Sequence, residues 1–135
     1  MTVEQFFTRY AALSMGDDDH SMAAMYAPSF FVAGPKGSMV FANDARFLEW
    51  LAQVRAFNRQ HGMHAVSPTA VQETTLSPIH VLARVRWSAR FKKTGDRAAE
   101  FEIAYLVERA GESWRVLGYV SERDQEEEMR ALGLL

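Results

Sequence analysis

The stretch Ile79–Phe91 reads IHVLARVRWSARF, and its alternation decides the fold class. Every second residue from Ile79 onward is apolar, and most of the residues between them are polar or charged. A period of two places the two sets of side chains on opposite faces of a β-strand. The stretch therefore predicts a long strand with one face on a core and the other toward solvent.

The same period returns twice farther along the chain, which predicts an antiparallel meander. The next strands carry these apolar residues: Phe101, Ile103, Tyr105 and Val107, then Trp114, Val116, Gly118 and Val120. A three-residue loop at 93–95 with a left-handed Gly95 would pair Trp87 with Phe101 and Ala83 with Tyr105. On the other face, Arg86 would then meet Glu102 and His80 would meet Glu108, which are favourable pairs. A four-residue loop at 110–113 would keep Tyr105 and Gly118 on one face.

The first half of the chain has the period of helices. An apolar stripe from Val3 to Leu13 predicts a first helix, and residues 22–26 predict a short second one that Pro28 stops. Asn43 or Asp44 is a suitable N-cap for a third helix that runs to about Gln60. Its apolar stripe is formed by Phe47, Trp50, Leu51, Val54 and Phe57. Strands are expected at 29–33, 38–42 and 63–76, with Pro68 at an edge or a bulge.

Composition narrows the class of protein. The chain has 135 residues, a net charge of −2 and no cysteine. This length predicts one domain, residues 1–135. The charge balance argues against a broad nucleic-acid or anionic membrane surface, and the lack of cysteine excludes disulfides and thiolate ligands. The N-terminus resembles no signal peptide and no apolar run could span a bilayer, so a cytoplasmic protein is expected.

Several short motifs, in this order and spacing, resemble the nuclear transport factor 2-like superfamily, particularly its SnoaL-like branch. They are Arg9–Leu13 (RYAAL), Gly16–Asp17, Met25–Ala27 (MYA) and Gly111–Val116 (GESWRV). The resemblance implies an α+β, cone-shaped (cystatin-like) fold, with three N-terminal helices packed on a strongly bent, mainly antiparallel sheet. It also implies an apolar pocket at the wide end and pairing of two copies through the outer sheet face.

The resemblance gives Tyr10 a candidate catalytic role, but the residues that would act with it are replaced in this sequence. In steroid isomerases of this superfamily the oxyanion-hole tyrosine falls on Tyr10, although Tyr10 also fits the core stripe of the first helix. Their general-base aspartate falls on Gly34, which has no side chain. Their second oxyanion donor falls on Ile103 or Ala104, and neither can donate a hydrogen bond. Proton abstraction by that mechanism is therefore not expected.

Two other groups of polar residues are weighed as sites. His64, near the exit of the third helix, is the second candidate catalytic residue because imidazole titrates near neutrality, although surface histidines are common. Asp17–Asp19 are interpreted as helix-capping residues. No pair of ligands has metal-site spacing, so neither a metal nor a cofactor is predicted.

The remaining apolar and charged residues predict a pocket and a pairing surface. We expect the pocket to be lined by aromatic residues and methionines, with a filled core as the alternative: Met22, Met25, Tyr26, Phe31, Trp50, Trp87 and Tyr105. Leucines on the otherwise polar sheet face predict a homodimer interface: Leu82, Arg84, Arg86, Leu106 and Leu117.

The leading hypothesis is a small-molecule pocket domain for an apolar or aromatic ligand, with no assigned activity and a lean against catalysis. The first alternative is a non-catalytic dimerisation or protein-interaction module. The second is a cofactor-free, metal-free isomerase, lyase or hydrolase that uses Tyr10, His64 or Tyr105. A C-terminal helix from Asp124, with Met129, Leu132 and Leu135 on one side, would cover the pocket mouth or a partner subunit.

Overall fold

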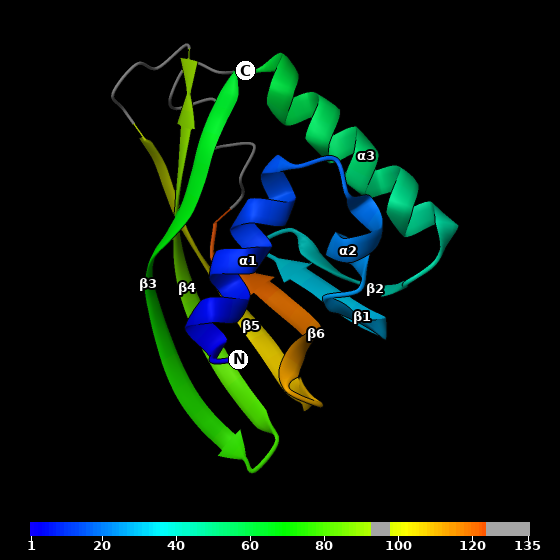
Figure 1. Ribbon diagram of the computed structural model, residues 1–135, viewed down its shortest axis with the longest axis vertical. Helices are drawn as coiled ribbons and strands as arrows, with labels where there is room; N and C mark the ends of the chain where they lie inside the picture. The colour runs from blue at the N-terminus through cyan, green and yellow to red at the C-terminus, as the bar shows by residue number, and fades with distance from the viewer. Residues whose placement is uncertain (93–97, 124–135) are drawn as a thin grey trace.

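The computed structural model describes residues 1–92 and 98–123, and there it contains three helices and one six-stranded sheet (Figure 1). The loop expected at 93–95 and the helix expected from Asp124 lie outside the described residues. The elements follow in this order: α1 (Val3–Met15), α2 (Asp19–Ala23), β1 (Tyr26–Gly34), β2 (Gly37–Ala42), α3 (Ala45–Gln60), β3 (Met63–Ser77), β4 (His80–Phe91), β5 (Ala98–Ala110) and β6 (Ser113–Ser121).

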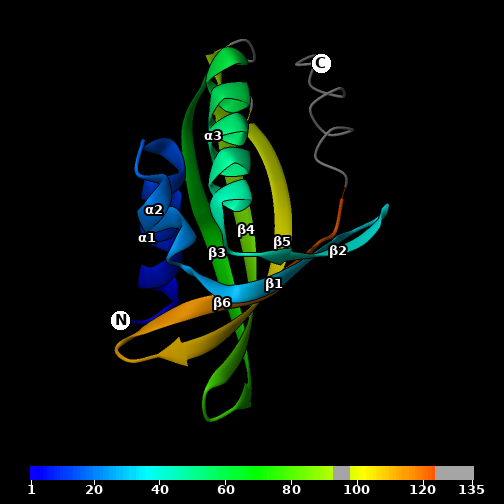
Figure 2. The ribbon, with the colours of Figure 1, turned by 90° about the vertical axis from the view of Figure 1, so that its right-hand side faces the viewer.

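The sheet has the order β2-β1-β6-β5-β4-β3 and is strongly bent. Strands β1 and β6 are parallel, and the other neighbours are antiparallel, so the expected mainly antiparallel sheet is confirmed. Figure 2 shows β1, β2 and β6 crossing the long strands β3, β4 and β5, while α1 lies over the concave face in Figure 1. The result is an open α+β cone in which helices cover one side of a sheet.

The long strand β4 has the predicted two faces. Trp87 is 3% exposed and Ala83 is fully buried, whereas Arg84 and Arg86 are exposed. The predicted pairs between β4 and β5 are all present: Trp87–Phe101, Ala83–Tyr105, Arg86–Glu102 and His80–Glu108. Across the ladder, Nε2 of His80 is 3.0 Å from a carboxylate oxygen of Glu108. The Arg86 guanidinium, however, pairs with the carboxylate of Glu100 at 3.0 Å and not with that of Glu102.

The edge strand β3 accommodates Pro68 as expected. It is the last strand in the sheet order, and its pairing with β4 shifts between Pro68 and Ala70. Proline has no N–H for the ladder, so an edge position next to a bulge leaves no hydrogen bond unmade.

A β-bulge in β6 overturns part of the predicted register. Val107 pairs with Val116 while Leu106 pairs with Gly118, so Leu117 is an extra residue in β6. An extra residue inverts the faces of the strand beyond it. The prediction that Gly118 shares a face with Tyr105 is therefore wrong, and Tyr119 is the residue that points inward. The predicted loop at 110–113 is also wrong, because Ala110 and Ser113 already pair.

In strand β1, too, the residues that face the core differ from those that the sequence predicted. Its pairing with β6 shifts between Tyr26 and Phe31. As a result Phe30 is 3% exposed inside the core, and Phe31 lies over Gly118 on the outer face. The expectation that Phe31 lines the pocket is therefore corrected.

Side-chain caps and ion pairs fix the helices. Asp44 caps α3 through the backbone N–H groups of Arg46 and Phe47, and Asp18 caps α2, as the sequence indicated. Asp17 pairs with Arg59 and Asp19 with Arg55, so the start of α2 is also bound to α3. The α3 stripe is only partly buried: Phe47 is inside, whereas Trp50 is 44% and Phe57 38% exposed.

Gly118 provides the first testable prediction, because Phe31 packs directly on it. A Cβ atom at residue 118 would lie 2.1 Å from Cδ1 of Phe31, a severe overlap. We expect Gly118→Ala to lower the free energy of unfolding by about 1–3 kcal/mol, as overpacked sites do. The same change made in a Phe31→Ala background should cost much less. Denaturant titration of the single and double variants measures this coupling.

Gly16→Ala is the matched control, because a Cβ there meets only backbone carbonyls at 3.7 Å. Equal losses of stability from Gly118→Ala in the two backgrounds would show that Phe31 is not the contacting group.

Candidate functional site

A cavity of about 190 Å³ lies between α1, α3 and the inner face of the sheet. One wall comes from Tyr10 and Ser14 of α1 and another from Asn58 of α3. Strands supply the rest of the lining: Met63, Val66, Trp87, Ala89, Phe91, Ala99, Phe101, Ile103, Tyr105 and Tyr119. The lining is mainly apolar with a few convergent polar groups, which is typical of small-molecule sites.

All four tyrosines of the chain gather at one end of this cavity. The hydroxyls of Tyr10 and Tyr26 are hydrogen-bonded to each other. The indole N–H of Trp87 donates to the hydroxyl of Tyr105 at 3.0 Å, and the ring centroids of Tyr105 and Tyr10 are 5.8 Å apart. The Tyr119 ring packs on Tyr105 with their centroids 5.5 Å apart. This tyrosine cluster joins α1, β1, β5 and β6.

One hydrogen bond of the cluster has a fixed direction. Trp87 can only donate, so the oxygen of Tyr105 accepts there and its own proton is available to Tyr10. The hydrogen bonds from Tyr26 and Tyr105 lower the pKa of Tyr10, whereas those with Tyr10 raise the pKa of the other two. Either hydroxyl of the Tyr10–Tyr26 pair can be the donor, so the cluster presents phenol groups that can both donate and accept.

Burial keeps the whole cluster uncharged. Desolvation is the largest cause of the raised pKa of Tyr10, Tyr26, Tyr105 and Tyr119. The coulombic effect of Tyr10 raises the pKa of Tyr26, Tyr105 and Tyr119 further, since two phenolates so close together would repel. At neutral pH the cavity therefore presents neutral phenol donors and no anion.

Three polar residues of the cavity, Ser14, Asn58 and Tyr119, escaped the sequence analysis. Asn58 stands at a position of the α3 stripe otherwise occupied by Phe47, Leu51 and Val54, and a polar residue in such a stripe is the signal that could have revealed it. For Tyr119 the only signal was Gly118, since an isolated glycine in a strand often marks a bulge.

The structure brings together only some of the predicted pocket residues. Tyr10, Tyr26, Trp87 and Tyr105 meet in the tyrosine cluster. Met22 and Trp50 line an adjoining cavity of about 140 Å³, together with Tyr10 and Tyr26. Met25 is buried and lines a different groove, which residues of α2 and β6 also line.

His64 is not brought to the cavity. It is exposed on β3, while its neighbours Met63 and Val66 line the cavity. A bulge between Met63 and Ala65 sets this arrangement. The geometry therefore does not support His64 as a catalytic partner of Tyr10.

The positions compared above with the base and the second oxyanion donor of steroid isomerases carry no side chain that can accept or donate a proton. Ile103 lines the cavity where a second oxyanion donor was considered, and Ala104 lies on the other face of β5. Gly34 lines a neighbouring groove with Tyr119. Among the described residues, no carboxylate, imidazole, lysine or arginine lines the 190 Å³ cavity. The described part of the lining thus has phenol and amide groups but no general base.

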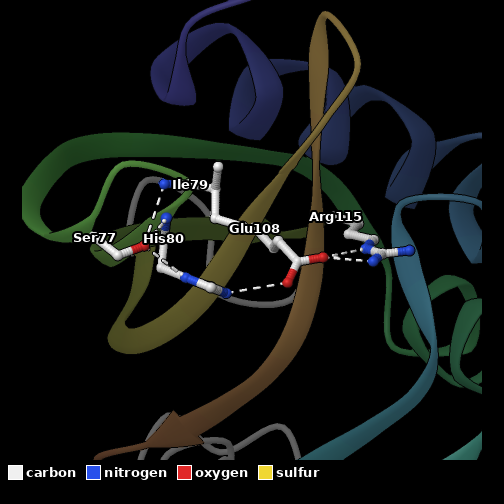
Figure 3. Close-up of polar contacts among 5 residues, drawn as sticks. All are labelled: Ser77, Ile79, His80, Glu108 and Arg115. Carbon is white, nitrogen blue, oxygen red and sulfur yellow. Dashed lines mark hydrogen bonds and ion pairs between the residues drawn. The ribbon is translucent and has the colours of Figure 1, made fainter.

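A second polar cluster lies on the outer side of the β3–β4 hairpin (Figure 3). Ser77 Oγ is 2.7 Å from Nδ1 of His80, whose Nε2 is 3.0 Å from Glu108, and Arg115 binds the same carboxylate. These bonds from Arg115 and His80 lower the pKa of Glu108. Although this resembles a serine triad, Ser77 Oγ already accepts the backbone N–H groups of Ile79 and His80. Its lone pairs are occupied, so the cluster stabilises the hairpin.

Neither a metal site nor a membrane segment is found in residues 1–92 and 98–123. No group of three or more His, Asp or Glu side chains there could hold a metal ion. No helix in the same residues has both the length and the apolar character needed to cross a bilayer.

Comparison with known proteins agrees with this architecture. The family described as NTF2-like protein (DUF6841) matches residues 1–124. No curated protein sequence matches the chain.

Solved structures resemble the chain in fold at low sequence identity. An NTF2-like protein with a cystatin-like fold from Novosphingobium aromaticivorans has a TM-score of 0.72 and 15% identity, over 96% of this chain and 85% of that one. Aln2 from Streptomyces has 0.69 and 18%, over 96% and 92%. A hypothetical protein with a ketosteroid isomerase-like fold from Catenulispora acidiphila, in complex with trimethylamine, has a TM-score of 0.60 and 16% identity, over 99% of this chain and 96% of that one. Likeness at this identity establishes the fold alone.

The raised pKa values of the four phenols predict how the protein responds to alkali. Because the folded state holds these protons more tightly than the unfolded chain, their contribution to stability is complete below about pH 10 and is lost as pH rises further. The free energy of unfolding should fall by up to about 1.4 kcal/mol per pH unit for each phenol. Phenolate absorbance should appear only together with loss of the native near-ultraviolet circular dichroism. Titration of any tyrosine near pH 10 in folded protein would contradict burial of the cluster.

Proposed function

The chain belongs to the NTF2-like family DUF6841, and we propose that it is a SnoaL-like binding domain whose cavity receives a small apolar or aromatic molecule. The main support is the cavity of about 190 Å³ enclosed by aromatic and aliphatic side chains, with polar groups at one end. An apolar cavity of about 150 Å³ is already large enough to bind benzene. The proposal is therefore compatible with a one-ring or two-ring ligand.

The proposed role is binding without catalysis. A general base would contribute about 10²–10⁴-fold to proton abstraction, and a second oxyanion donor about 10²–10³-fold. Gly34 and Ile103 occupy the corresponding positions and supply neither group. An isomerase, lyase or hydrolase reaction would have to proceed with phenols alone, which are weak bases when protonated.

Naphthalene, a neutral and apolar probe, tests the binding proposal. We expect one molecule to bind per chain and Ala99→Leu to abolish the binding, because Ala99 lines the cavity and the larger side chain would fill it. Equilibrium dialysis of naphthalene against the protein, with the naphthalene on each side quantified by its fluorescence, gives the stoichiometry. Ala70→Leu on exposed β3 is the control that should leave binding unchanged. Absence of saturable binding to the original protein would refute the proposal.

A homodimer is the second proposal, and the outer face of the sheet supports it. Register places the predicted leucines Leu82 and Leu106 next to each other there. The apolar surface continues across the sheet through Phe31, Val40 and Val120, of which Val40 is 77% and Val120 47% exposed. Large exposed apolar patches of this kind mark interaction surfaces.

The charges on this outer face suit a self-complementary contact. Arg84 and Arg86 lie on β4, and Glu100 and Glu102 lie on β5, so the face carries both signs beside its leucines. A two-fold axis brings the same patch of two copies together, so such a mixed face can pair with itself. Leu117, the bulge residue, is half-buried beside the patch.

Light scattering tests the dimer. A Leu82→Lys and Leu106→Lys double variant should be monomeric, because four buried ammonium groups would face one another across the two-fold interface. A Gln53→Lys and Gln60→Lys double variant, at two exposed positions of α3, is the charge-matched control and should remain dimeric. A monomeric original protein, or a dimeric double variant, would refute this interface.

A further inference from the structure

We infer that the ligand is an elongated molecule, with a compact apolar end in the cavity and an apolar chain that passes Trp50 into the groove between α3 and the β1–β2 hairpin. This inference rests on the proposed function and names the shape and chemical class of its ligand. It follows from the order in which the hollow spaces adjoin, from the apolar surface exposed at the outermost one and from the way in which Trp50 is held.

The first observation is that three hollow spaces follow one another from the interior to the surface. The cavity of about 190 Å³ adjoins one of about 140 Å³ at four shared lining residues, which include Tyr10 and Asn58. The smaller cavity in turn shares Trp50, Val54 and Tyr119 with a groove of about 530 Å³. Tyr119 lines all three spaces, so they are arranged around one side chain. An elongated molecule can therefore occupy all three.

The second observation is that the outer groove exposes large apolar side chains. Met39 of β2 is 64% exposed and Trp50 of α3 is 44% exposed, and both line the groove. Val32 and Phe41 continue the apolar lining on the two strands of the hairpin. Exposed apolar surface of this kind is typical of ligand-binding grooves. Because the groove adjoins the inner cavities, we assign it to the outer part of the same ligand.

The third observation concerns how Trp50 is held at the boundary between the smaller cavity and the groove. Trp87 and Trp114 donate hydrogen bonds through their indole N–H groups. Within the described part of the chain, the Trp50 side chain makes no hydrogen bond, and its ring stacks on Phe41 and Phe47 with centroids 6.5 and 6.1 Å apart. Displacement of the Trp50 ring therefore breaks no polar interaction there, which lets a chain pass beside it.

The walls also indicate which end of the ligand can be polar. Arg55 and Asp19 are the only charged residues in the described wall of the smaller cavity, and they pair with each other at 2.5 Å. The middle of the ligand therefore meets no unpaired charge. The groove has polar lining residues at the surface, Ser38 and Ser121 among them. A neutral chain with a polar far end, such as a long-chain alcohol, fits this distribution.

A series of phenylalkanols tests this inference on the full chain. The four members are 2-phenylethanol, 4-phenyl-1-butanol, 6-phenyl-1-hexanol and 8-phenyl-1-octanol, which share the ring and the terminal hydroxyl. We expect the affinity, measured by isothermal titration calorimetry, to rise about fourfold for each methylene group that the cavities enclose. Beyond them the rise should continue at about twofold for each methylene group, because a chain in the groove leaves one side in water.

Met39→Ser assigns the outer part of the chain to the groove. It should lower the affinity for 8-phenyl-1-octanol about twofold to fourfold. It should leave the affinity for 2-phenylethanol nearly unchanged, since Met39 lines the groove and neither cavity. Leu76→Ser is the matched control, because Leu76 is 56% exposed and lines none of the three spaces. This control should leave the affinity for every member unchanged.

Acrylamide quenching of tryptophan fluorescence locates the bound chain directly. Of the three tryptophans, Trp50 is 44% exposed, whereas Trp87 and Trp114 are 3% and 8% exposed. The fluorescence that acrylamide quenches therefore comes mainly from Trp50, and Trp50→Phe should remove it. Saturation with 8-phenyl-1-octanol should protect Trp50 from acrylamide, whereas saturation with 2-phenylethanol should not.

The outcomes separate this inference from the proposed function. An affinity that stops rising when the cavities are filled, or that Met39→Ser leaves unchanged for the longest alcohol, would overturn the elongated ligand while the binding proposal stands. A bound long chain that leaves Trp50 open to acrylamide would do the same. Protection of Trp50 in the ligand-free protein would overturn the inference in favour of a groove covered by residues 124–135 or by a second copy of the chain. Failure of all four alcohols and of naphthalene to bind would refute the binding proposal itself.

Discussion

The packing of α1 on the concave face of the sheet is the contact on which the rest of the structure depends. Phe7 lies with its ring centroid 4.7 Å from Tyr105 and 6.3 Å from Trp87, and all three side chains are almost completely buried. A capping box between Thr2 and Gln5 fixes the start of the helix. Because Tyr10 follows Phe7 by three residues, the same contact carries its hydroxyl over the cavity. The bent sheet thus has a polar group in its interior.

Local periodicity was sufficient to predict the helices and strands whose side chains keep one regular period from end to end. The alternation in Ile79–Phe91 fixed both the buried face and the pairing with β5, because a shift by one residue would have exposed Trp87 and buried Arg86. Asp44 as the cap of α3 and Pro68 at an edge bulge were equally local inferences. The fold class and the central registers could therefore be read without a structure.

The candidate site was less predictable because it depends on irregularities. The extra residue Leu117 turns Tyr119 inward, and nothing in the alternation of β6 distinguishes this from a regular strand. Two adjacent phenylalanines, Phe30 and Phe31, fit either face equally well, so tertiary packing decides between them. Asn58 becomes meaningful only when α3 is placed over the cavity. Residues that determine the chemistry of the site are those for which regular patterns fail.

The described lining of the cavity limits the chemistry that its residues could supply. A neutral donor such as Tyr10 stabilises a carbonyl oxygen in the ground state and in an enolate-like transition state, so part of its effect strengthens binding alone. Acceleration of proton transfer requires a base within hydrogen-bond reach, and Gly34 removes that group while Ile103 makes the opposite wall apolar. The raised pKa of the phenols further prevents Tyr10 from acting as a base near neutral pH. The described lining, with hydroxyl and amide groups and no base, is the basis for proposing that the cavity binds a neutral ligand rather than converting it.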